Sequence, residues 1–208
     1  MKVLITGAGA PGGPAAIKGL RDAGHVVTSV DIDSSAVGRH FADNFEVIYP
    51  ALSKNFITSL LDVALKYKVE CIIPLVTNEL LILSENLEIF SKNNIEVIIS
   101  NSENLKIAND KLRCYQILNS VTLAIPKFQR VKKIDTLKSQ AIELGFPNLP
   151  VVIKPSCSNG SRGVKIFDNN NDYYQEVFVQ KPGSLKCDID QYIHSLKQMK
   201  KIPENKTY

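Results

Sequence analysis

A lysine followed by a glycine-containing loop is the clearest chemical feature of the sequence. A β-branched run over 151–153 ends at Lys154, and Gly160 and Gly163 follow closely. A lysine at the end of a strand is a point charge in a fixed place, and glycines let backbone N–H groups approach an anion because no Cβ intervenes. In the P-loop the glycines precede the lysine, whereas here they follow it. The segment predicts a nucleotide-phosphate site, and an ordinary hairpin turn is the alternative.

A second glycine cluster lies near the N-terminus. Gly7, Gly9 and Gly12 match the G-x-G-x-x-G pattern between an apolar segment and a helical one, and Asp31 ends the next apolar segment. In a dinucleotide-binding fold these glycines approach the pyrophosphate and the acid binds the ribose, so NAD binding is an alternative function. However, a tight strand-to-helix crossover needs glycines without any ligand. Two prolines in the same turn also lack the N–H groups that would hold a pyrophosphate.

Hydrophobic patterning predicts the elements that position these residues. Residues 1–112 alternate between short apolar segments and segments of helical period, with Ser53 as the expected N-cap of the second helix. This alternation predicts an α/β fold with a doubly wound, mostly parallel, Rossmann-like sheet. The predicted strands are 2–6, 26–31, 45–48, 70–74 and 96–99, and the predicted helices are 14–23, 54–66, 78–91 and 102–108.

Residues 113–208 follow a different pattern, which predicts a partial α+β subdomain. A helix begins after Asp110-Lys111, and Gly145 ends a later one. Two strands flank the glycine loop that follows Lys154. The predicted helices are 112–118, 134–144 and 188–199, and the predicted strands are 128–131, 151–153 and 164–167.

The order of these features resembles the ATP-grasp superfamily, and in particular proteins similar to the carbamoyl phosphate synthase large subunit. The resemblance rests on the glycine-rich start, on Asp110-Lys111 at a helix start, on Ile125-Pro126 before a strand, and on Lys154-Pro155. It implies that residues 1–112 are a pre-ATP-grasp domain. It also implies that residues 113–208 are the N-terminal part of an ATP-grasp domain whose C-terminal subdomain is missing.

The same resemblance implies a set of ATP-binding residues. Lys154 is similar to the strand lysine that contacts the phosphates, and Lys111 to the basic residue that precedes the ATP-grasp fold. A solvated lysine at a helix start remains the alternative for Lys111, and a surface ion pair the alternative for the arginine of the loop. The resemblance implies neither a catalytic residue nor a metal ligand in this chain. The loop that covers the phosphates corresponds to Gly160, Ser161, Arg162 and Gly163.

The implied activity is ATP-dependent ligation of a carboxylate to an amine through an acyl phosphate, with ATP and Mg²⁺ as cofactors. In relatives an adenine-side strand and the Mg²⁺ ligands follow the glycine loop, and neither is recognisable before Tyr208. We therefore interpret the chain as the N-terminal part of a ligase, either truncated or half of a split pair, and inactive alone. The implied partners are ATP, small carboxylate and amine substrates and the missing C-terminal half, and a homodimer is compatible with the resemblance.

Composition agrees with a cytoplasmic protein. The chain has 208 residues, 44% of them hydrophobic, no apolar run of membrane-spanning length and no signal-peptide pattern. Its net charge of +4 derives mostly from residues 181–208, where six lysines face three acids, so no nucleic-acid-binding stripe is predicted. The four cysteines lack C-x-x-C spacing, which indicates neither a zinc site nor a disulfide framework.

Overall fold

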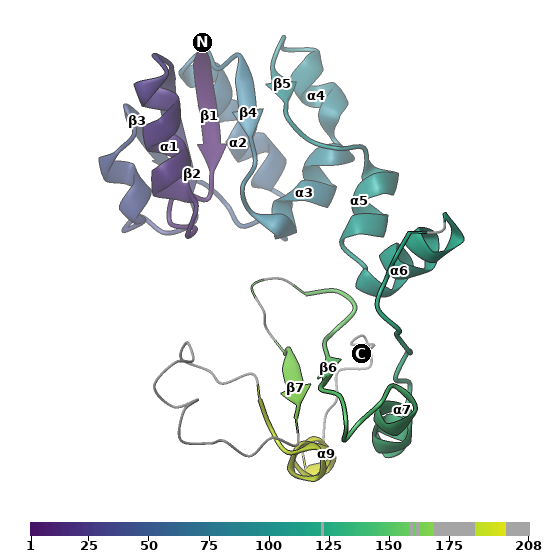
Figure 1. Ribbon diagram of the computed structural model, residues 1–208. Coiled ribbons are helices and arrows are strands. Elements are labelled where there is room, and N and C mark those ends of the chain that lie inside the picture. The colour runs from purple at the N-terminus through teal and green to yellow at the C-terminus, as the bar shows by residue number, and fades with distance from the viewer. Residues whose placement is uncertain (122, 159, 161–162, 169–185, 199–208) are drawn as a thin grey trace. The chain divides into compact units, whose positions relative to one another are not determined.

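The computed structural model of the chain describes residues 1–121, 123–158, 160, 163–168 and 186–198 (Figure 1). The chain divides into two compact units, residues 1–106 and residues 107–208, and each unit is described by itself. Ser161 and Arg162, which were predicted to belong to the phosphate loop, lie outside the described residues. So does Met199 at the end of the last predicted helix.

Five parallel strands form the sheet of the first unit in the order β3-β2-β1-β4-β5. The chain moves outward from β1 to β3 and then returns to add β4 and β5 on the other side. The direction of winding therefore reverses between β1 and β4, as the predicted doubly wound class requires. The strands are β1 (Lys2–Thr6), β2 (Val26–Asp31), β3 (Asn44–Val47), β4 (Cys71–Ile73) and β5 (Glu96–Val97).

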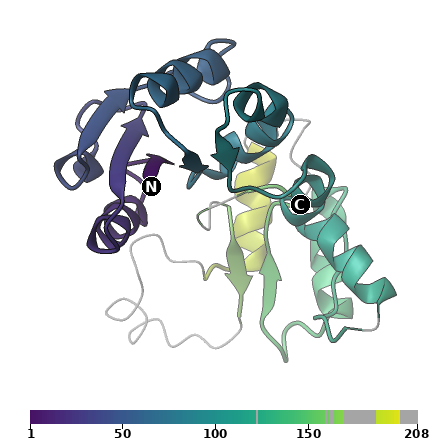
Figure 2. The same cartoon turned by 90° about the horizontal axis from the view of Figure 1, so that it is seen from above.

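Helices cover both faces of this sheet (Figure 2). On β1, Ile5 packs with Ile17 of the first helix, whereas the adjacent Leu4 packs with Phe56 and Leu60 on the opposite face. Successive side chains of a strand point to opposite faces, so a strand covered on both sides must be apolar throughout. The helical elements are α1 (Gly13–Asp22), η1 (Val37–His40), α2 (Phe56–Lys66), α3 (Thr77–Ser84), α4 (Leu87–Ser91) and α5 (Ser102–Ala108).

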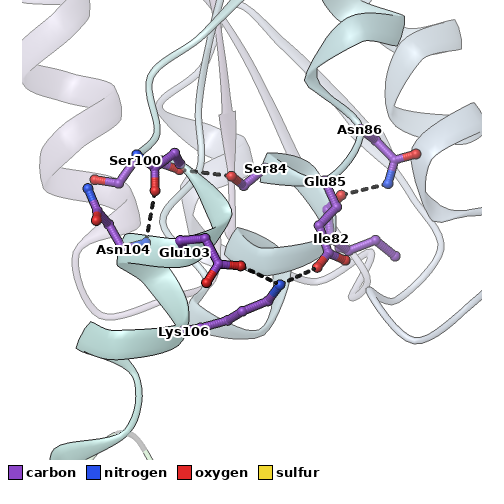
Figure 3. Close-up of polar contacts among 9 residues, drawn as sticks. Ile82, Ser84, Glu85, Asn86, Ser100, Glu103, Asn104 and Lys106 are labelled. Atoms are coloured by element: carbon purple, nitrogen blue, oxygen red, sulfur yellow. Dashed lines mark hydrogen bonds and ion pairs between the residues drawn. The ribbon is translucent and has the colours of Figure 1, made fainter. Parts of the chain in front are cut away.

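The helix predicted over 78–91 is two helices, because the chain breaks after Ser84. The Asn86 side chain explains the break: its Nδ2 donates to the carbonyl oxygen of Ile82 at 2.8 Å and so satisfies one of the carbonyls at the end of α3. Figure 3 shows this contact beside the ion pairs of Lys106 with Glu85 and Glu103. The prediction of one continuous helix was wrong because the apolar spacing continues across the break.

Ser53 is not the N-cap of α2. Its Oγ accepts a hydrogen bond from the backbone N–H of Asn55 at 3.2 Å, within a turn that precedes the helix. The helix itself begins at Phe56, and Asn55 occupies the N-cap position without a side-chain cap bond. The predicted cap is therefore corrected to a serine turn.

The second unit contains a two-stranded antiparallel sheet with helices packed around it. Its core is a cluster of Leu137, Ala141, Ile153, Phe167 and Ile189. The strands pair so that position 153 lies opposite position 165. The elements are α6 (Lys111–Ser120), η2 (Ile134–Thr136), α7 (Leu137–Glu143), β6 (Val151–Ile153), β7 (Lys165–Phe167) and α9 (Ile189–Gln198).

The strand predicted at 128–131 is not formed. Side chains of α7 form hydrogen bonds with this segment instead. Gln140 Nε2 donates to the Arg130 carbonyl oxygen at 3.1 Å, and the Glu143 carboxylate accepts from Gln129 Nε2 at 2.8 Å. In the part of the chain that the structure describes, no strand pairs with this segment. The prediction was wrong because an extended segment becomes a strand only where a partner strand pairs with it, and the sequence pattern does not reveal that partner.

Candidate functional site

Lys154 directly follows β6 and is half-buried. Its Nζ donates to the hydroxyl oxygen of Tyr115 at 2.9 Å, and the same ammonium lies 4.9 Å from the centre of the Tyr115 ring. The phenol thus orients the ammonium with one hydrogen bond and a cation–π contact. A lysine ammonium has three donors, so this arrangement leaves capacity for an anionic ligand.

Lys111 is the first residue of α6 and lies beside the segment that follows Lys154. Its Nζ donates to the carbonyl oxygen of Ser158 at 2.8 Å, and its backbone N–H donates to the carbonyl oxygen of Ser156 at 2.9 Å. The helix start is fixed independently, because the Asp110 carboxylate accepts the N–H groups of the next two residues in the helix. These contacts join the helix start to the predicted phosphate loop.

Two glycines of the predicted loop have backbone conformations that favour glycine. Gly160 has φ +59° and Gly163 has φ +75°, both in the left-handed region. A Cβ on Gly163 would also come within 2.9 Å of Cγ of Pro155. Gly163 therefore lies close against the residue that follows Lys154. Ser161 and Arg162 belong to the same predicted loop but lie outside the described residues.

A pocket of about 380 Å³ brings the two lysines into one place. Lys111 and Lys154 both line it, together with the rings of Tyr115 and Phe128, whose centres are 5.2 Å apart. Lys127, Gln129, Arg130 and Gln140 also line it, and most of its remaining wall consists of apolar side chains from α6, α7, β6, β7 and the segments that connect them. A concave apolar site of this size with a few convergent polar groups is typical of small-molecule binding.

The N-terminal glycine cluster forms a different kind of loop, in the first unit. The N–H of Ala8 donates to the Val30 carbonyl, and the N–H of Gly9 donates to Asp31 Oδ2 at 2.7 Å. Ala10 likewise donates to the Gly7 carbonyl at 2.9 Å. Donors that a pyrophosphate would need are thus used within the protein, and the acid predicted to bind a ribose accepts a backbone N–H instead.

Gly7 and Gly13 are the two glycines of this region that neighbouring atoms approach most closely. Gly7 has φ +70°, and a Cβ there would lie 2.5 Å from Cγ2 of Val76. A Cβ on Gly13 would meet the carbonyl oxygens of Gly7 and Ala8 at 2.5 and 2.7 Å. Gly12, the last glycine of the fingerprint, has no described atom within 4 Å of its Cβ position. Helix packing therefore explains these glycines at least as well as a ligand does.

Glu79 is an acid that sequence reasoning passed over. It lies in the first turn of α3, where acids are common because they complement the helix dipole, and it is only 5% exposed. Burial raises its pKa to about 7, while a hydrogen bond with the Thr6 side chain lowers that pKa and the Asp31 charge raises it. Among the described atoms, none is hydrogen-bonded to Glu79 Oε2. Its place just after β4, at the carboxyl edge of the sheet, is the signal that could have revealed it.

Within the described ranges, no three His, Cys, Asp or Glu side chains gather in a way that could hold a metal ion. The same residues include no helix that is long and apolar enough to cross a bilayer. The four cysteines, which the described part of the chain includes, are free.

The first unit is similar to a known protein family. Residues 3–98 match the PylC-like, N-terminal domain family. No curated protein sequence matches the chain significantly. The matched family segment coincides with the doubly wound sheet and its helices, so the likeness concerns the unit that carries the N-terminal glycine loop.

Solved structures extend the likeness to both units. Staphylococcus aureus N5-carboxyaminoimidazole synthetase, complexed with ADP, is 16% identical with a TM-score of 0.59, over 99% of this chain and 44% of that one. The Thermotoga maritima N5-carboxyaminoimidazole ribonucleotide synthetase is 18% identical with a TM-score of 0.54, over 88% and 44%. The biotin carboxylase domain of Hydrogenobacter thermophilus 2-oxoglutarate carboxylase, in complex with MgADP, ADP and bicarbonate, is 21% identical with a TM-score of 0.52, over 79% and 37%.

These similarities confirm the predicted resemblance to the ATP-grasp superfamily and the predicted α/β class. At such low identity the structures establish the fold alone. The chain spans less than half the length of the structures that it matches.

Proposed function

We propose that the second unit binds the phosphates of ATP through Lys111, Lys154 and the loop that contains Gly160 and Gly163. Ser161 and Arg162 complete that loop in the sequence and belong to the same proposal. Bound ATP would supply a transferable phosphoryl group, and the lysines of this chain would hold and neutralise its phosphates. The neighbours with ADP in their structures make a nucleotide the natural candidate.

One observation carries this proposal: the two lysines, from different elements, line one apolar pocket. Lys154 is held by a phenol and Lys111 by backbone carbonyls, so an anion can replace weak neutral acceptors rather than break an ion pair. Aromatic and aliphatic walls beside the ammonium groups of Lys111, Lys127 and Lys154 suit a ligand that is apolar at one end and polyanionic at the other. A nucleotide has that chemistry.

The wider function follows as part of the same proposal. We infer that the chain is the N-terminal portion of an ATP-dependent carboxylate–amine ligase resembling the carbamoyl phosphate synthase large subunit. The ligase would act in the cytoplasm on small carboxylate and amine substrates, and a homodimer is compatible with it. The Mg²⁺ ligands and the adenine-side wall would come from the C-terminal part of the enzyme, so this chain alone would bind ATP without turning it over.

NAD binding by the N-terminal loop is the competing function. It would require the N–H of Gly9 and the carboxylate of Asp31 to exchange their mutual hydrogen bond for contacts with a ligand. Gly7 and Gly13 are also explained by close packing. These contacts favour a structural role for the loop.

Titration calorimetry with ATP and with NAD on the 208-residue chain separates the two functions. We expect weak ATP binding, with a Kd of about 1 mM, because only one side of the nucleotide would be contacted. We expect no heat of binding with NAD. Binding of NAD without ATP would reverse the assignment of the two loops.

A further inference from the structure

The pocket of the second unit has a wall whose charged residues are all cationic. Lys111, Lys127, Arg130 and Lys154 line it, and the described residues of the wall include neither an aspartate nor a glutamate. A concave site lined by charges of one sign concentrates the field that they produce. The potential inside this pocket therefore favours an anion, and one of high charge most of all.

Two carboxylates contact residues of this wall, and both accept hydrogen bonds from the protein. Glu143 accepts from Nε2 of Gln129 at 2.8 Å, and Asp110 accepts two backbone N–H groups of α6. They reduce the positive potential of the pocket, but neither of them belongs to its wall. In the described part of the chain, no ion pair involves any of the three lysines of the wall. Their charge is available to a ligand.

The segment that carries Lys127 is anchored directly after it. The ring of Phe128 packs on that of Tyr115 in α6, and the carbonyl oxygen of Arg130 accepts from Nε2 of Gln140 in α7. Figure 1 shows these two helices in the second unit. A side chain on an anchored backbone loses less entropy when it binds a ligand. Lys127 is therefore a third ammonium group of the pocket, beside the two lysines already assigned to phosphates.

Magnesium suits this wall poorly. Protein sites for Mg²⁺ use carboxylates and other oxygen ligands in near-octahedral geometry, and the described residues contain no group of acids, histidines or cysteines that could hold a metal ion. A magnesium ion on a polyphosphate also cancels two of its negative charges and brings a cation among the cations of the wall. Both effects favour a polyphosphate that carries no metal.

We propose that this pocket binds a free polyphosphate anion in preference to its magnesium complex, and that Lys127 contributes to the preference. For a nucleotide the favoured form is the metal-free ATP anion, and that attribution rests on the proposed function. Ligands for Mg²⁺ from the C-terminal part of the proposed ligase would reverse the preference in the complete enzyme. In the 208-residue chain the cations of the wall decide it.

The test is titration calorimetry of the 208-residue chain with inorganic tripolyphosphate, first in EDTA and then in excess magnesium chloride. Potassium chloride keeps the ionic strength equal, and the cell and the syringe contain the same buffer. We expect the Kd to be at least about tenfold higher in Mg²⁺, because the complex has lost part of the ligand charge. Equal affinity, tighter binding of the magnesium complex, or no binding in EDTA would each overturn the proposal.

Lys127→Gln and Lys132→Gln form a matched pair, because both remove one charge from the same segment and Lys132 is not part of the wall. We expect Lys127→Gln to weaken metal-free tripolyphosphate binding about threefold and to reduce the effect of Mg²⁺, since an exposed charge contributes modestly. Lys132→Gln should resemble wild type. Identical behaviour of the two variants would exclude Lys127 from the site.

Repeating both titrations with ATP separates this proposal from the proposed function. Tripolyphosphate has no nucleoside, so a metal-free preference for it without any ATP binding would contradict the proposed function alone. ATP binding of equal strength in EDTA and in Mg²⁺ would contradict only the preference for the free anion.

Discussion

The molecule contains two glycine-rich loops after strands, and they differ in what their polar groups do. In the loop after β1, backbone N–H groups donate to Val30, Asp31 and Gly7, so these donors already have hydrogen-bond acceptors within the protein. The segment after β6 is held by a cation: Lys111 binds the carbonyl oxygen of Ser158. A second cation, Lys154, is held nearby by a phenol.

This difference shows that glycine spacing reports backbone geometry, whereas the groups around a loop report its chemistry. Both loops contain glycines with positive φ. The segment after β6 contributes Ser156 to the pocket that Lys111 and Lys154 also line. A fingerprint is therefore strong support for a strand-to-helix crossover and weak support for a ligand.

The largest expected effect comes from adding a methyl group to Gly13. Gly13→Ala places a Cβ against the carbonyl oxygens of Gly7 and Ala8, so we expect the free energy of unfolding to fall by about 3 kcal/mol. Gly12→Ala is the matched control, and its cost should stay below about 1 kcal/mol because no described atom is near. Urea unfolding of both variants measures the difference. Equal costs would contradict the packing role of this loop.

Glu79→Gln should change how stability depends on pH. The folded-state pKa of Glu79 is about 7, above its ordinary value of 4.5, so the folded state holds the proton more firmly. Wild-type stability should therefore fall between pH 4.5 and pH 7, by at most about 3 kcal/mol from this group.

The glutamine variant should lack that decline. It should exceed wild type in stability above pH 7 and lose this advantage towards pH 4.5. Urea unfolding across this pH range measures the change, and Glu88→Gln serves as the control. An identical pH profile for Glu79→Gln and wild type would exclude a raised pKa at this position.

The smallest expected effect concerns the phenol that holds Lys154. Tyr115→Phe keeps the ring and its cation–π contact but removes the hydroxyl acceptor. We expect ATP affinity to fall about fivefold, which corresponds to the loss of one hydrogen bond worth about 1 kcal/mol that orients the ammonium. Calorimetry measures this change. A rise in affinity would show that the hydroxyl competes with phosphate for Lys154.

Sequence patterning predicted the sheet better than it predicted the helix ends. Leu4 and Ile5 are apolar because both faces of β1 are covered, so burial leaves a direct trace in the sequence. The break after Ser84 leaves no such trace, because it depends on where the Asn86 amide finds an acceptor. The predicted strand at 128–131 was wrong for a similar reason, since strand formation requires a partner in space.

The residues of the candidate site also differ in whether the sequence could predict them. Lys154 and the glycines after it were predicted from local sequence, because a strand end and a turn are local features. Tyr115 was not, since it lies 39 positions before Lys154 and reaches it only through the fold. Glu79 looks in the sequence like an ordinary acid in a first helical turn, and only its burial sets it apart. Glycine and charge patterns predict candidate sites, whereas burial and partners require coordinates.

The most direct test of the account is an ATP titration of Lys154→Met against Lys165→Met. Lys165 pairs with position 153 across the sheet, and alternation directs the side chains of positions 153 and 154 to opposite faces, so it is a matched control. We predict that Lys154→Met lowers ATP affinity about tenfold to a hundredfold, because a charge-assisted contact is worth about 1.5–3 kcal/mol, and that Lys165→Met keeps wild-type affinity. Equal ATP affinity in wild type and Lys154→Met would contradict the assignment of the phosphate site.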